Sequence, residues 1–164
     1  MLPAGATEWR QNVLVTPGTT STKAALSVAM DANGTLRVVF EDDRDGSPAV
    51  WYATLAPMGT AWSAATKVSD ETSSAPQRTP KVALDAQGNA TVVWIDAVPS
   101  GSVVRARRDL AHGGWESSSR VISDAGAVPG APTLSARSHG RVIALRERDR
   151  REGFGIRSVL NRHL

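Results

Sequence analysis

The chain has 164 residues and a mass of 17.3 kDa, a length that suggests a single domain. Its 41% apolar content excludes a disordered tail, and its lack of cysteine excludes disulfides, zinc thiolate sites and thiol catalysis. The formal net charge is only +3. No stretch approaches the roughly 18 apolar residues of a membrane span, and the start lacks the features of a signal peptide. We therefore expect a soluble chain or one made without its leader, in a compartment that the sequence leaves unknown, the extracellular space included if the parent protein is longer.

In chain order, the first expected element is a strand over Glu8–Thr16. Two matching segments follow, LSVAMDANGTLRVVFED at 26–42 and PKVALDAQGNATVVWID at 80–96, in which equivalent residues lie 54 positions apart. A third and weaker copy, PTLSARSHGRVIALRE, places its glycine 52 positions after that of the second copy. The chain therefore consists of about three copies of one repeated unit.

Each unit is expected to hold four short strands. Two strands flank a D-x-x-G turn, whose glycine is expected to take a positive φ. A third strand, SVVRARRDL in the second unit, alternates with a period of two, and a fourth, GWESSSRVIS, follows a glycine turn. The last expected strand covers Phe154–Asn161, and no window carries a helical stripe. The sequence therefore predicts an all-β fold.

Four antiparallel strands in about 54 residues, repeated along the chain, resemble the blades of a β-propeller. The resemblance implies three four-stranded blades, at about 17–70, 71–124 and 125–164, the last completed by strand 8–16. The pattern departs from the Asp-box, WD40 and kelch subclasses, so their functions are not carried over. A three-sheet β-prism or a sandwich is the competing architecture.

The order of the strands has a consequence for assembly. The chain starts with the fourth strand of a blade and ends with a third strand, which resembles the closure of propellers in which an N-terminal strand completes the last blade. Three blades are too few to close a ring. We therefore expect a homodimer that forms a six-bladed ring by exchanging the strand around Trp9, unless the chain is a fragment of a longer propeller. Residues 1–104 carry a net charge of −3 and residues 105–164 a net charge of +6. In the ring, the basic third blade of one chain would lie beside the acidic first blade of the other, and opposite charges favour that contact.

The polar loop FEDDRDGSPAVWY offers the first candidate ligand residues, Asp43 and Asp45. Alternating acids followed by glycine partly match the start of a calcium loop. The closing position is Tyr52 instead of glutamate, so a solvated hairpin turn is the better interpretation. We therefore predict no cofactor and no metal site, with calcium as the remaining alternative.

The tryptophans offer a candidate sugar site, because an indole face can stack on a pyranose ring. Trp9, Trp62 and Trp115 recur at steps of 53 residues, which favours a packing role. Trp51 breaks the repeat, since its equivalents are Arg105 and approximately Arg157, and it is therefore the expected ligand platform.

The remaining candidates are Arg148, Arg150 and Arg151, which are expected on the same loop face as Asp43 and Asp45. Acidic residues are interleaved with the arginines, so nucleic-acid binding is not expected. The sequence shows no catalytic constellation. It predicts a non-enzymatic binding or assembly module, with a glycan or a small molecule as the ligand considered. The alternatives are a lectin-like propeller that binds glycans and an excised part of a sialidase-like or lyase-like enzyme.

Overall fold

The structure, a computed structural model, describes residues 13–69, 75–123, 131–136, 142–146 and 157–160. These residues form β-strands and no helix, which confirms the all-β prediction. The strands are β1 (Lys23–Met30), β2 (Leu36–Asp42), β3 (Ala49–Leu55), β4 (Thr66–Lys67), β5 (Gln77–Leu84), β6 (Ala90–Val98), β7 (Gly101–Leu110), β8 (Gly114–Trp115), β9 (Arg120–Val121), β10 (Thr133–Ala136), β11 (Val142–Arg146) and β12 (Arg157–Leu160).

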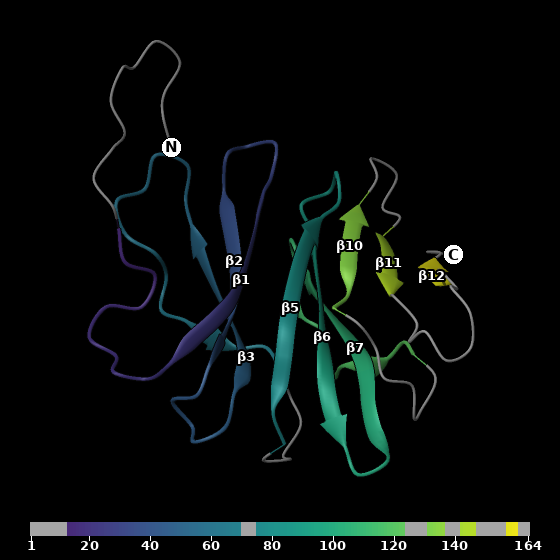
Figure 1. Cartoon of the computed structure of the whole chain (residues 1–164). Coiled ribbons are helices and arrows are strands. Elements are labelled where there is room, and N and C mark those ends of the chain that lie inside the picture. The colour runs from purple at the N-terminus through teal and green to yellow at the C-terminus, as the bar shows by residue number, and fades with distance from the viewer. Residues whose placement is uncertain (1–12, 70–74, 124–130, 137–141, 147–156, 161–164) are drawn as a thin grey trace.

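The strands make three antiparallel sheets, which we call blades 1, 2 and 3 (Figure 1). Blade 1 has the order β1-β2-β3-β4, and blade 2 has the order β5-β6-β7-β8 with β9 also paired to β7. Blade 3 has the order β10-β11-β12. The first strand of each blade lies next to the first strand of the following one, because β1 contacts β5 and β5 contacts β10. This arrangement of successive antiparallel sheets is propeller-like.

The pairing register shows that the three sheets are copies of one unit. Trp51 in β3, Arg105 in β7 and Arg157 in β12 each pair with the equivalent residue of the preceding strand. Trp51 therefore occupies the repeat position that arginine fills in the other two blades, as the sequence predicts.

The D-x-x-G segments form the expected tight turns between the first two strands of blades 1 and 2. Gly34 and Gly88 have φ values of 87° and 81°, a region that glycine enters without a steric penalty. The preceding Asp31 accepts hydrogen bonds from two backbone N–H groups through Oδ1, each at 2.9 Å, and Asp85 does the same at 3.0 and 2.9 Å. The aspartate thus fixes the turn while the glycine reverses the chain.

An irregularity that sequence reasoning missed interrupts the first strand of blades 1 and 2. The ladder shifts register between Ala24 and Ser27 and again between Arg78 and Lys81. Ala25 and Thr79 lie inside these two bulges with φ values of 47° and 52°. A bulge of this kind bends a strand and leaves one of its N–H groups without a ladder partner.

The free N–H group of the second bulge is satisfied by the neighbouring blade. Thr79 N donates to Glu41 Oε1 at 2.7 Å, and Arg78 lies 3.4 Å from the other carboxylate oxygen. Glu41 belongs to β2 of blade 1 and is 5% exposed. A buried carboxylate therefore joins the two blades through the backbone.

The apolar core lies between blades 1 and 2. Trp94 is fully buried there, and Val68, just after β4, is also fully buried. The remaining members come from both sheets and include Val39, Val50, Tyr52, Val82, Ala90 and Val92. Blades 1 and 2 thus each bury one face against the other.

The strand predicted at 8–16 is not formed over residues 13–16, and residues 8–12 lie outside the described part of the chain. Val15 nevertheless packs on the buried cluster of Phe40 and Trp51 on the far side of blade 1. Within the described residues the segment has no neighbouring strand with which to form a ladder, which explains why it is placed without being paired.

We predict that Glu41→Ala lowers the free energy of unfolding by about 1–3 kcal/mol, because it leaves the partly buried Thr79 N–H without an acceptor. Urea denaturation at one fixed protein concentration measures the change. The matched control is Asp45→Ala, which removes an exposed ion pair to Lys67 and is expected to cost less than about 1 kcal/mol. Equal losses in the two variants would contradict the role given to Glu41.

Candidate functional site

The loop that joins β2 to β3 carries two of the predicted ligand residues. Asp43 Oδ1 accepts a hydrogen bond from Thr22 N at 2.7 Å, and the Asp43 carbonyl accepts one from Gly46 N at 2.7 Å. Asp45 is exposed and lies 3.3 Å from Lys67 Nζ. The loop is therefore a hairpin turn in which Asp43 is already engaged by the backbone.

The acidic side chains of this loop point to different partners. Glu41 reaches toward blade 2, Asp43 toward the backbone at Thr22, and Asp45 toward Lys67. Within the described ranges no three acidic, histidine or cysteine side chains gather as a metal site would require.

A buried ionic cluster lies directly beside the loop. The Asp42 carboxylate is fully buried and contacts Arg44 Nη2 at 2.5 Å, while its other oxygen accepts a hydrogen bond from Arg44 N at 2.9 Å. Lys23 Nζ lies 3.6 Å away. The Arg44 guanidinium also covers the ring of Trp51, with Cζ 4.1 Å from the ring centroid, a cation–π contact.

The pKa of Asp42 is lowered to about 2. Burial alone would raise this pKa, but the hydrogen bonds from the Arg44 side chain, from Ser21 and from Arg44 N stabilise the carboxylate more strongly. Asp42 is therefore ionised at neutral pH and holds Arg44 in place over Trp51.

Trp51 is not the exposed platform that the sequence suggested. It is 9% exposed and packs in the buried cluster with Val38, Phe40 and Ala53. Breaking the repeat does not free a residue from packing, because Trp51 lies on a covered face of β3 and Arg44 covers its ring. The sequence carried a signal for the contact of Arg44 with Trp51, because Arg44 lies in the turn just before β3, the strand that holds Trp51.

Blade 2 carries a related ionic pair at the equivalent place. Asp96, 2% exposed, lies 2.7 Å from Arg105 Nε, and Arg105 occupies the repeat position of Trp51. A buried aspartate paired with an arginine thus recurs at the end of the second strand. Recurrence favours a structural role for the Asp42 cluster over a ligand-binding one.

The other three predicted ligand residues, Arg148, Arg150 and Arg151, lie outside the described residues. The structure does describe Asp43, Asp45 and Trp51. They lie at one end of blade 1 and do not line a common cavity.

An exposed apolar strip runs along β1 on the side of blade 1 that faces away from blade 2. We call it the open strip, and it consists of Leu26, Val28 and Met30, which are 61%, 54% and 54% exposed. The counterparts of these residues in the repeat are Pro80, Val82 and Leu84 of β5. Pro80 is fully buried, and Val82 and Leu84 pack in the core between blades 1 and 2. The same surface is therefore buried in blade 2 and uncovered in blade 1.

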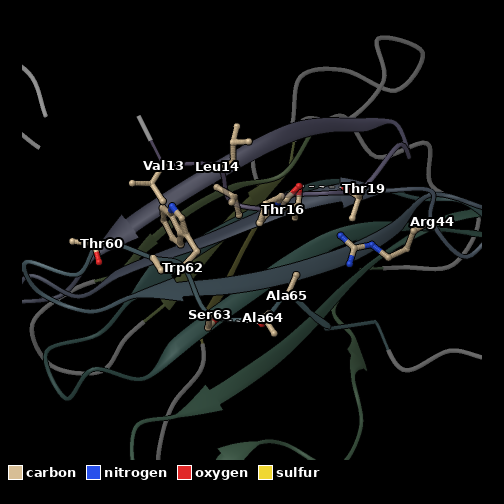
Figure 2. A pocket seen from close by; sticks show the side chains of 13 residues that line it. Val13, Leu14, Thr16, Thr19, Arg44, Thr60, Trp62, Ser63, Ala64 and Ala65 are labelled. Atoms are coloured by element: carbon tan, nitrogen blue, oxygen red, sulfur yellow. Dashed lines mark hydrogen bonds between the residues drawn. The ribbon is translucent and has the colours of Figure 1, made fainter. Parts of the chain in front are cut away.

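A groove of about 660 Å³ lies on the same side of blade 1 as the open strip, next to the part of that side that is buried. Figure 2 shows Trp62 toward one end of the groove and Arg44 toward the other, with the segment 13–19 facing the segment 60–65. Sequence analysis did not predict it, because its two walls lie more than 40 residues apart in the chain.

No protein-family model matches the chain, and no curated protein matches it. A search of solved structures finds an endo-arabinase from Bacteroides thetaiotaomicron, a β-propeller glycosidase, with a TM-score of 0.60 and 12% sequence identity. The match covers 92% of this chain and 59% of that one. The likeness shows a propeller-like fold, and the chain spans well under two thirds of the arabinase.

Among the described residues no helix is long and apolar enough to cross a membrane.

We predict that Asp42→Asn lowers the free energy of unfolding by about 2 kcal/mol at neutral pH. The folded pKa of about 2 lies below the ordinary value of 3.8, so the carboxylate stabilises the fold above about pH 4, and this contribution is lost as the pH falls toward 2. Urea denaturation between pH 2 and pH 7 is expected to show the two proteins converging in acid. Asp45→Asn is the control, and a constant gap between wild type and Asp42→Asn would rule out the ionic role.

Proposed function

We propose that the chain is a half-ring that pairs with a second copy into a six-bladed propeller, and that this ring is a non-enzymatic binding module. The open strip of Leu26, Val28 and Met30 is the observation that carries the proposal. In blade 2 the equivalent strip packs on the preceding blade, so blade 1 presents a surface shaped for another blade. Blade 3 of a second copy is the occupant we infer.

Burial of the open strip supplies a driving force for the pairing. Removing a leucine, valine or methionine side chain from water contributes roughly 1.5–3 kcal/mol. A two-fold arrangement buries two such strips, one at each seam. An isolated patch of this kind on a monomer is a feature of interaction surfaces.

The N-terminal segment supports the same arrangement. Val15 packs on blade 1 near Phe40, as Val68 packs on blade 2 near Trp94. The segment 13–16 thus takes the place of a last strand from a preceding blade. Its backbone would complete blade 3 of the second copy, whose β12 is paired with β11 alone among the described strands.

Charge supports this choice of neighbour. Blade 3 lies in the part of the chain with a net charge of +6, and blade 1 lies in the part with a net charge of −3. Placing them side by side joins surfaces of opposite sign, which favours the correct register and a faster association.

The ligand of the ring is proposed to meet the loop face that carries Asp43 and Asp45. The glycan-binding alternative would need another platform, because Trp51 is 9% exposed and covered by Arg44. The likeness to an endo-arabinase supports the shared fold and carries no substrate over at 12% identity.

Light scattering coupled to size exclusion is expected to give a mass of about twice 17.3 kDa. Val28→Lys is expected to raise the dissociation constant at least about hundredfold, because each of two seams would bury an unpaired ammonium group.

The matched control is Val121→Lys, which changes another exposed valine, 48% exposed, at the repeat position that Lys67 occupies in blade 1. This variant is expected to remain dimeric. A wild-type mass of 17.3 kDa, or equal dissociation of both variants, would overturn the half-ring proposal.

A further inference from the structure

The groove on blade 1 has a filled counterpart on blade 2. There Arg107 donates from Nε and Nη2 to the Glu116 carbonyl at 2.9 and 2.7 Å, and from Nη1 to the Val68 carbonyl at 2.7 Å. Its Cζ atom lies 5.7 Å from the ring centroid of Trp115. Arg107 therefore joins the last strand of blade 1 to the outer part of blade 2.

Blade 1 has alanine where blade 2 has this arginine. Ala53 pairs with Val38 in the register in which Arg107 pairs with Val92. Its methyl group is fully buried and is too short to reach the positions that a guanidinium group would occupy. The third strand of blade 1 therefore supplies no head group in the place of the Arg107 guanidinium.

The three partners of Arg107 nevertheless have counterparts around the groove. Ser63 N donates to Thr54 O at 2.8 Å just as Glu116 N donates to Arg108 O at 2.9 Å, so Ser63 corresponds to Glu116. By the same repeat Trp62 corresponds to Trp115. The remaining counterpart is Val15, which packs on blade 1 as Val68 packs on blade 2.

All of these counterparts, Val15, Trp62 and Ser63, line the groove. We propose that the groove is a guanidinium-binding site that accepts an arginine side chain from a second polypeptide. This goes beyond the half-ring proposal and does not depend on it, because both walls of the groove belong to one chain. The incoming guanidinium donates to the carbonyl groups of Val15 and Ser63 and lies against the Trp62 ring.

Arginine suits the site better than lysine does. A guanidinium group is planar and has five N–H donors in a fixed fork, so it can serve two carbonyl groups on opposite walls at once. Among the described residues that line the groove, Arg44 is the cation, and it is paired with the buried Asp42 at 2.5 Å and stacks on Trp51. Its charge is thus balanced within the protein.

The test titrates ¹⁵N-labelled protein with the peptide acetyl-Gly-Arg-Gly-amide and follows the amide signals by NMR. Saturable shifts are expected in segments 13–19 and 60–65. A peptide with citrulline, the neutral isostere, is expected to bind at least about tenfold more weakly, because it loses the charge-assisted hydrogen bonds. Equal binding of the two peptides, or no saturable shift with arginine, would overturn the proposal.

Two variants test the correspondence with Arg107. Ala53→Arg is expected to fill the groove from within and to reduce binding of the arginine peptide at least about tenfold. Arg107→Ala is expected to open a second site, seen as new peptide-dependent shifts in residues 66–69 and 113–118 and as a rise in melting temperature with the arginine peptide and not with the citrulline peptide.

Unchanged binding by a folded Ala53→Arg variant would overturn the proposal. If that variant does not fold, Arg107→Ala decides, and a lack of new shifts in it would overturn the proposal in the same way.

Discussion

The structure depends on burial of one blade's sheet face against the next blade. A sheet of four strands with two apolar faces cannot hide both of them by itself, so each blade needs a neighbour. Blades 1 and 2 satisfy this requirement around the fully buried Trp94. Among the described residues, Val15, Trp62 and Ala65 pack on the far side of blade 1, while the open strip on β1 is exposed. The proposed assembly and the groove both follow from this uneven cover.

Several polar groups also pair between blades 1 and 2. Glu41 supplies the acceptor that the bulge at Thr79 requires, and the Tyr52 hydroxyl donates to Asp109 Oδ2 at 2.9 Å across the two blades. Burial and the Asp109 carboxylate raise the pKa of Tyr52, so this hydroxyl keeps its proton. The Arg37 guanidinium donates to the Gly88 carbonyl of the next blade. A buried polar group that has its partner costs little free energy, whereas one that has lost its partner destabilises the fold. These pairs therefore fix the register of one blade on the next.

Positions at which one blade departs from the repeat are the candidates for function, but the role of each depends on the side chains that surround it. Trp51 departs from an arginine position, and the sequence suggested a free aromatic ring. In the structure the ring is buried because Arg44, from the adjoining turn, covers it. Ala53 also departs from an arginine position, and here β3 contributes no arginine to the groove that Val15, Trp62 and Ser63 line. Both departures are visible in the aligned repeats, but which of them leaves a space depends on contacts between segments distant in the chain.

The sequence by itself determined the all-β class, the threefold repeat, the Asp–Gly turns and the repeat position of Trp51, because these follow from local periodicity and turn chemistry. The bulges at Ala25 and Thr79, the burial of Trp51 and the groove beside Trp62 were decided by the tertiary structure. At Thr79 the free N–H group of the bulge is accepted by Glu41 of the neighbouring blade. The groove arises where segments 13–19 and 60–65 meet, which are more than 40 residues apart in the chain. Such meetings depend on how the sheets pack, which the local pattern of each strand does not encode.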